Sequence, residues 1–254
     1  MCLLSMPTWP SFNTRAVHET EIMDDFSVTD ERLTVALRDI RVTNRLLGGY
    51  GPSHRAIRAL LTDNGPHRVL DLGSGSADYP AHLVQWADAQ DLDVRVDALE
   101  ANPVTARHAR SYLDRTLPPR LRSRVQVRCA DVFDYAPDDT AYDIAHAGLF
   151  LHHFPDDDLV RLLGRMRTLC PHGLVINDLH RHPLAYASIW LLSRLLPTSP
   201  MYQHDAPLSV RRAFTQDELM RVVEAAGYAS AQIRWHWAFR WVVQAHPTTP
   251  ELPA

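Results

Sequence analysis

Between residues 68 and 178 the chain alternates short apolar runs with stretches whose apolar residues recur at helical spacing. Helix-like stretches follow Tyr79, Pro103 and Pro155. The apolar runs between them read VLDL, VRVDALE, VQVRCADVF, YDIAHAGLFL and GLVINDL. Such alternation predicts βαβ units around a parallel sheet, and continuously apolar runs are typical of strands covered by helices on both faces. We therefore expect an α/β fold with a doubly wound sheet.

Two segments lie outside this alternation. Residues 19–62 precede the sheet and contain helical periodicity, most clearly over 31–47, which ends at a Gly-Gly pair. Residues 180–214 follow the fifth strand with an apolar helix and then an irregular stretch rich in Pro, Ser, Tyr and His, which we expect to form a cap. We predict one globular unit, with an N-terminal helical cap at 1–62 and a core at 63–254 that carries this insertion.

The end of the chain predicts one more helix and a hairpin. Thr215 and Glu218 form a capping box for a helix that Gly227 ends. Two β-rich runs, 231–235 and 239–245, then stand three residues apart, which suits an antiparallel hairpin at the sheet edge.

Composition limits the partners and the compartment. The formal net charge is -4, and all 26 basic residues are arginine because the chain has no lysine, so no nucleic-acid partner is expected. The three cysteines lie far apart, which favours a reducing cytoplasm. The apolar runs MCLLSMPTWPSF and SIWLLSRLL are shorter than the roughly 20 residues of a membrane span. The sequence leaves a homodimer open.

Residues 71–80 read DLGSGSADYP and fit a turn between a strand and a helix. Gly73 and Gly75 would let the backbone approach a ligand at the carboxyl ends of the strands, where open α/β sheets bind nucleotides. Asp71 and Asp78 would repel a pyrophosphate but attract a sulfonium and an α-amino group. Each glycine alone also fits an ordinary tight turn, and Asp78 alone fits a helix-dipole residue.

Two further acids end the next two strands. Glu100 ends the second strand, where a carboxylate can accept both hydroxyls of a ribose. Asp131 ends the third strand, where a carboxylate can accept from an adenine amino group while the backbone N–H of Val132 donates to the ring. Asp131 also fits a helix cap. Three acids at three successive strand ends favour a nucleoside site.

The stretch DLGSGSA resembles the first motif of class I S-adenosylmethionine-dependent methyltransferases, with Ala77 in place of a common third glycine. In that resemblance Glu100 is the ribose-binding acid and Asp131 the adenine contact. It covers about residues 65–180 and the final hairpin. It implies a mostly parallel, seven-stranded Rossmann-like methyltransferase fold and S-adenosylmethionine as the cofactor.

The loops after the fourth and fifth strands, LFLHHFPDDD and NDLHRHPLAY, are rich in histidine and emerge at the same sheet edge. A histidine there suits removal of a hydroxyl proton near neutral pH. We predict that His180 or His153 is this base, with a preference for His180; the alternative is that His153 only packs under its loop. The ligand spacing is not diagnostic of a metal, so no metal is predicted.

Candidate acceptor and cofactor contacts come from the two caps. Tyr202, His204 and Arg212 lie in MYQHDAPLSVRRAF, a stretch that resembles, together with EIMDD, a bacterial group of methyltransferases associated with polyketide and phenolic-lipid pathways. A surface role for Arg212 is the alternative. Arg45, just before the Gly-Gly helix end, is a candidate contact for the cofactor carboxylate, and a surface role is again open.

These residues together predict an S-adenosylmethionine-dependent methyltransferase for a small, apolar, hydroxylated acceptor, aromatic or polyketide-like, with O-methylation as the reaction. The LHHF stretch also resembles the ubiquinone- and menaquinone-type methyltransferases, which keeps C-methylation of a quinone precursor as an alternative. Two further alternatives are an NAD-type oxidoreductase, which Asp78 disfavours because it stands where the third fingerprint glycine would be, and a noncatalytic nucleoside-binding protein.

Overall fold

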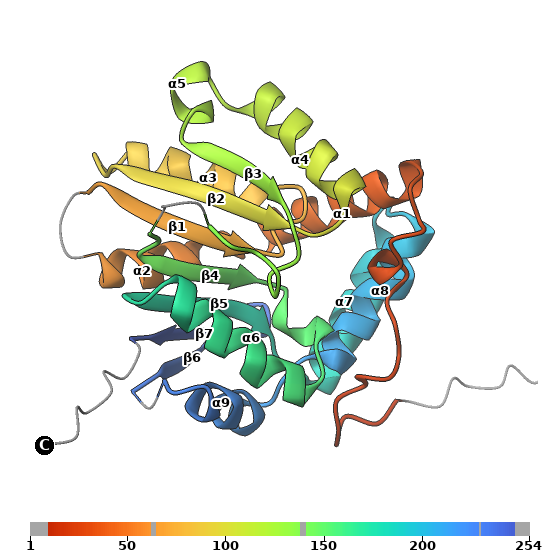
Figure 1. Ribbon diagram of the computed structural model, residues 1–254. Coiled ribbons are helices and arrows are strands. Elements are labelled where there is room, and N and C mark those ends of the chain that lie inside the picture. Colours follow the sequence, from red (N-terminus) through yellow and green to blue (C-terminus); the bar gives the residue numbers. More distant parts are fainter. Residues whose placement is uncertain (1–9, 62–64, 138–140, 229, 247–254) are drawn as a thin grey trace, which may run out of the picture.

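A computed structural model describes residues 10–61, 65–137, 141–228 and 230–246. Its sheet has seven strands in the order β3-β2-β1-β4-β5-β7-β6. The first five strands run parallel, while β7 pairs antiparallel with both β5 and β6. This confirms the doubly wound fold with a hairpin at its edge (Figure 1). The strands are β1 (His67–Leu72), β2 (Val94–Glu100), β3 (Val125–Cys129), β4 (Ile144–Gly148), β5 (Gly173–Leu179), β6 (Gln232–His236) and β7 (Arg240–Ala245).

Helices cover both faces of the sheet. Side chains of α2, α3 and α4 pack in the cluster on one face, and those of α6 and α9 in the cluster on the other. Along β1 the neighbours Val69 and Leu70 belong to opposite clusters. Because both faces are buried, the middle of the strand is continuously apolar. The helices are α1 (Glu31–Leu46), α2 (Tyr50–Leu60), α3 (Asp78–Asp88), α4 (Pro103–Thr116), α5 (Pro119–Arg122), α6 (Asp156–Leu169), α7 (Pro183–Leu195), α8 (Pro200–Arg212), α9 (Gln216–Ala225) and the 3₁₀ turns η1 (Ile22–Asp24) and η2 (Leu151–His153).

The N-terminal segment and the insertion after β5 pack together. Helices α1, α7 and α8 gather beyond the carboxyl ends of the parallel strands (Figure 1). Leu33 and Leu37 of α1 share an apolar cluster with Met201 of α8. The carboxylate of Asp39 accepts a hydrogen bond from the backbone N–H of Ser199, which begins α8 (2.7 Å). Helix α2, in contrast, packs on the sheet against β5 and β7. The division into a cap at 1–62 and a core at 63–254 stays a prediction.

The stretch expected to be irregular is a helix, so that expectation is wrong. Ser199 caps α8 by accepting from the backbone N–H of Tyr202, and Pro200 occupies the first turn, where its missing N–H costs nothing. Pro207 lies inside the helix, and a proline at such a position favours the prediction of a loop. Among the described residues, no helix is both long and apolar enough to cross a membrane.

Candidate active site

The turn after β1 has the backbone that the glycines predict. Gly73 has φ +62°, a conformation that side chains disfavour, and a Cβ on it would collide with the ring of Phe150. Gly75 and Ala77 also have positive φ, at +52° and +55°. Ala77 is fully buried, so the turn accepts a methyl group at the position where the resembling motif commonly has a third glycine. The turn therefore brings its backbone close to the loop after β4.

Asp71 is buried and held by protein groups on both of its oxygens. Its Oδ1 lies 2.5 Å from Nδ1 of His146, and its Oδ2 accepts from the Ser74 hydroxyl (2.5 Å). The other ring nitrogen of His146 lies 3.1 Å from the Ser53 hydroxyl on α2, to which Asn177 at the end of β5 also donates (2.9 Å). Asp71 is thus connected through His146 to Ser53 of α2.

Asp78 has partners of its own. One of its oxygens accepts from the Ser76 hydroxyl (2.8 Å) and the other from the Tyr50 hydroxyl. Burial, together with the Asp78 charge, raises the pKa of Tyr50, so the phenol keeps its proton. Asp78 therefore joins the start of α2 to the start of α3.

Glu100 braces the turn from the next strand. Its Oε2 accepts from the backbone N–H of Gly75 and its Oε1 from that of Asn102, both at 2.9 Å. Burial raises the pKa of Glu100, although both N–H groups favour the charged form. A carboxylate has about four acceptor positions, so two are left for hydroxyl groups of a ligand in the cavity that Glu100 lines.

Asp131 and Val132 lie at the end of the next strand and also line the cavity. Val132 is buried, while Asp131 is exposed and its Oδ1 accepts from the backbone N–H of Phe133 (2.9 Å). The second Asp131 oxygen makes no hydrogen bond with the described part of the chain. The structure thus brings Asp71, Gly73, Gly75, Glu100, Asp131 and Val132 to one cavity.

Arg45 is not at this site. Its side chain is exposed and does not line the cavity. The neighbouring Asn44 lines it instead, and Oδ1 of Asn44 accepts from the Arg240 guanidinium of β7 (2.6 Å). Successive helical residues point about 100° apart, so Asn44 lines the cavity while the adjacent Arg45 points away from it.

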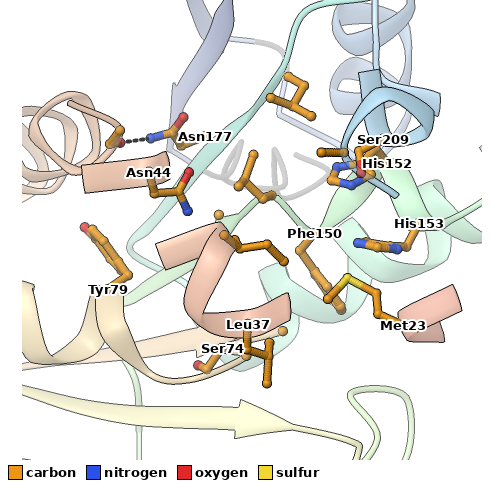
Figure 2. Close-up of a pocket in the computed structure, with 18 of the residues that line it drawn as sticks. Met23, Leu37, Asn44, Ser74, Tyr79, Phe150, His152, His153, Asn177 and Ser209 are labelled. Carbon is orange, nitrogen blue, oxygen red and sulfur yellow. Dashed lines mark hydrogen bonds between the residues drawn. The ribbon is translucent and has the colours of Figure 1, made fainter. Parts of the chain in front are cut away.

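The cavity measures about 710 Å³ and extends from the β1 turn to the loop after β4 and to helix α7. Figure 2 shows Phe150 between the turn at Ser74 and the pair His152 and His153. Trp235 and Trp237 of the hairpin also line it and are 49% and 77% exposed, which places them at its mouth. Its apolar walls come from η1, α1, α7, the β4 loop and the hairpin: Met23, Phe26, Leu33, Leu37, Ile40, Leu47, Phe150, Phe154, Ile189, Leu192, Trp235, Trp237 and Phe239.

His180, the preferred base, lies outside this cavity. Side chains alternate along a strand, so Leu179 faces the cavity and His180 faces away. The His180 ring packs near Trp241 and His182, at centroid distances of 4.7 and 5.3 Å. Burial lowers its pKa, but it has no access to a ligand in the cavity. The preference for His180 is therefore not supported.

His153 lines the cavity but is paired. Its Nδ1 lies 2.8 Å from an oxygen of Asp24 in η1. Burial works against a charged ring, yet the carboxylates of Glu21 and Asp24 outweigh it and raise the pKa of His153 to about 9. A ring that carries a proton at neutral pH does not accept another. His153 therefore lines the cavity as predicted, but its ring is protonated at neutral pH, which does not suit a base.

His152 is the residue that sequence reasoning did not select. It is buried, lines the cavity, and its Nδ1 lies 2.7 Å from Oδ1 of Asp178. Asp178 is fully buried and also accepts from the backbone N–H groups of Leu151 and Leu179 (2.8 and 2.7 Å). Burial opposes its charge, but His152 and the backbone N–H of Leu179 lower the pKa of Asp178. This pairing directs the other His152 nitrogen, Nε2, towards Glu21.

The three cap candidates have different places. Tyr202 lines the cavity, and its hydroxyl donates to Thr43 of α1 (2.8 Å). His204 is exposed and points away beside Asp205. Arg212 is buried behind the wall, where it donates to the carbonyl oxygens of His152 (3.2 Å) and His153 (2.7 Å). Tyr202 is the one of the three that lines the cavity.

Comparison with known proteins agrees with this geometry. Residues 69–173 match the family described as "Methyltransferase domain". No curated protein sequence matches the chain.

Three solved structures show the fold. A SAM dependent methyltransferase from Aquifex aeolicus is 15% identical with a TM-score of 0.58, over 82% of this chain and 95% of that one. Human N-acetylserotonin methyltransferase in complex with SAM is 14% identical with a TM-score of 0.61, over 91% and 60%. The O-methyltransferase NcsB1 from neocarzinostatin biosynthesis is 16% identical with a TM-score of 0.59, over 89% and 62%. The chain spans less than two thirds of the latter two proteins. It contains, over residues 69–173, a methyltransferase domain, and its fold is that of the class I S-adenosylmethionine-dependent methyltransferases.

Proposed function

We propose that this protein transfers the methyl group of S-adenosylmethionine to a hydroxyl oxygen of a small, largely apolar acceptor with an aromatic or polyketide-like ring. The observation that carries the proposal is the continuous cavity, which joins the β1 turn to an apolar chamber with a histidine at its far end. The comparison with NcsB1, whose structure contains 1,4-dihydroxy-2-naphthoic acid and S-adenosylhomocysteine, supports an acceptor of this kind.

The cofactor would bind along the strand ends. Glu100 would accept from the ribose hydroxyls, and Asp131 and the Val132 N–H would hold the adenine. Asp71 lies at the turn, where its negative charge favours a sulfonium and an amino group over a pyrophosphate. Asp71 and Asp78, the acids at the turn, also disfavour the NAD-type alternative.

Methyl transfer would then need alignment, exclusion of water and removal of one proton. The acceptor oxygen attacks the methyl carbon, the S–CH₃ bond breaks, and S-adenosylhomocysteine leaves with the electron pair. His152 is placed to take the hydroxyl proton on Nε2, because Nδ1 is held by Asp178. C-methylation of a quinone precursor stays the second candidate, since an activated ring carbon fits the same chamber.

Two measurements test the proposal. Calorimetric titration should show binding of S-adenosylmethionine and not of NAD, and a labelled-methyl transfer assay over aromatic hydroxyl compounds should find an acceptor. Binding of NAD alone would overturn the cofactor assignment, and tight S-adenosylmethionine binding without transfer to any acceptor would favour the noncatalytic alternative.

The role of His152 has its own test. His152→Asn keeps a donor towards Asp178 but removes Nε2, and should lower turnover by about 10²- to 10⁴-fold while S-adenosylhomocysteine affinity stays the same. His180→Asn is the matched control and should leave turnover near normal, because His180 lies outside the cavity. Equal turnover in both variants would remove His152 from the reaction.

A homodimer, the absence of nucleic-acid binding and a cytoplasmic location stay predictions from the sequence.

A further inference from the structure

The far end of the cavity contains a buried carboxylate oxygen without a hydrogen-bond donor. Glu21, which precedes η1, is 2% exposed, and its Oε1 makes no hydrogen bond with any residue that the structure describes. The nearest guanidinium nitrogen, Nε of Arg212, lies 3.8 Å away, beyond hydrogen-bond distance. A buried charge without such a partner costs several kcal/mol. Glu21 therefore calls for a cation or a donor in the space that it faces.

Two histidines face the same space. Nε2 of His152 lies 3.7 Å from Oε1 of Glu21. One ring nitrogen of His152, one of His153 and one oxygen of Glu21 all lie within 4.8 Å of one another. Tetrahedral coordination with bonds of about 2.1 Å separates ligand atoms by about 3.4 Å, so side-chain rotation closes the difference. We propose that Glu21, His152 and His153 bind a divalent first-row transition-metal ion.

The surroundings fit such a site in a second way. Histidines that bind metals usually have a carboxylate or carbonyl on the other ring nitrogen, which fixes the ring and raises its basicity. Nδ1 of His152 lies 2.7 Å from Asp178, and a carboxylate oxygen of Asp24 lies 2.8 Å from Nδ1 of His153. His152 therefore has a hydrogen-bonded acid on its other ring nitrogen, and His153 has a carboxylate at ion-pair distance.

The charges around the site leave room for a divalent cation. The carboxylates of Glu21, Asp24 and Asp178 converge here. Arg212 is the permanent cation beside the first two, at 3.8 and 3.2 Å. Arg15 pairs with Asp156 (2.5 Å), and Arg15 and Arg240 both act on the charge of Asp178. Around Glu21 and Asp24 the acids still outnumber Arg212 by one, and a bound ion would take the place of the proton on His153.

The ligand set indicates which ions would bind. Two imidazoles and a carboxylate suit Zn²⁺, Fe²⁺ and Co²⁺ rather than Mg²⁺ or Ca²⁺, which prefer oxygen ligands. Three protein ligands leave at least one coordination position. Because His152 and His153 line the cavity, that position would face the acceptor.

Binding is tested on the full chain, stripped with a chelator and without cofactor or acceptor. Added Co²⁺ should give visible d–d absorption at one ion per chain, and Zn²⁺ should abolish it by displacement. Glu21→Gln keeps the size but removes the charge, and should weaken Co²⁺ binding at least tenfold; His153→Asn should do the same. His204→Asn is the matched control, because it removes an exposed histidine that also neighbours an aspartate.

Absorption that is absent in the wild type, or unchanged in both ligand variants, would overturn the site. Equal thermal unfolding midpoints for the variants and the wild type exclude misfolding as the cause of lost binding. The effect on turnover rests on the proposed function: the ion and the acceptor proton use the same Nε2, so Zn²⁺ should slow methyl transfer. If Zn²⁺ binds but accelerates transfer, the metal site stands and His152 as the base is wrong.

Discussion

At the scale of single residues, Glu100 both stabilises the β1 turn and lines the cavity. It holds the β1 turn through the Gly75 N–H, and it offers its remaining acceptor positions to the cavity. Glu100→Ala should therefore weaken S-adenosylhomocysteine binding at least tenfold, since each charge-assisted hydrogen bond contributes about 1.5–3 kcal/mol. Glu224→Ala, on the exposed face of α9, is the control. Calorimetry that found equal affinities would refute the ribose assignment.

Gly73 is the glycine whose replacement the structure penalises most clearly at this turn. Gly73→Ala places a Cβ in left-handed backbone, at a cost of about 1–2 kcal/mol, and drives it into the ring of Phe150. We expect a lower unfolding midpoint and weaker cofactor binding. Gly164→Ala, inside α6 with no atom within 4 Å of the new Cβ, should instead keep or raise stability. A variant Gly73→Ala as stable as the wild type would contradict this account.

At the scale of elements, the contact between α2 and α3 makes stability depend on pH. His54 of α2 stacks on Trp86 of α3 at 5.0 Å, and burial lowers the pKa of His54 to about 3. The unfolded chain takes up this proton near pH 6.5 but the folded chain does not. The stabilisation from the neutral ring is complete above about pH 6.5 and is lost as the pH falls towards 3.

His54→Phe keeps an aromatic ring on Trp86 and removes the titrating group. Urea unfolding at about pH 7 and pH 5 should show a smaller loss of unfolding free energy in the variant than in the wild type. The difference is bounded by about 1.4 kcal/mol per pH unit for one proton. Equal losses would mean that His54 already titrates normally in the folded protein.

The elements also show how far the sequence could lead. The strand-end acids Asp71, Glu100 and Asp131 were found because a parallel sheet brings consecutive strand ends to one edge. The preferred base, His180, lies outside the cavity because one step along β5 turns a side chain from the cavity to the opposite face. Asp178, at the end of β5, was the available signal for His152, since it is the acid that reaches the preceding strand's loop.

At the scale of the whole molecule, the far end of the site depends on contacts that no local pattern reveals. Glu21 lies far from the histidine loop in the chain. It reaches the loop because Asp205 of α8 accepts the backbone N–H groups of Ile22 and Met23 (2.9 and 3.1 Å), while Arg212 of the same helix holds the loop itself. The site forms because the N-terminal segment packs against the insertion after β5, two parts that are distant in the sequence.

The indoles at the mouth of the cavity also make the protein its own optical reporter. Trp235 and Trp237 are partly exposed to water and line the chamber. They belong to the β6–β7 hairpin, not to the turn after β1 where the cofactor would bind. An aromatic acceptor that enters would displace water from these rings, so their fluorescence should shift to shorter wavelength; S-adenosylhomocysteine alone should leave it unchanged. Replacing both by phenylalanine should abolish the shift. Entry of the acceptor could then be timed by stopped flow, separately from the transfer of the methyl group.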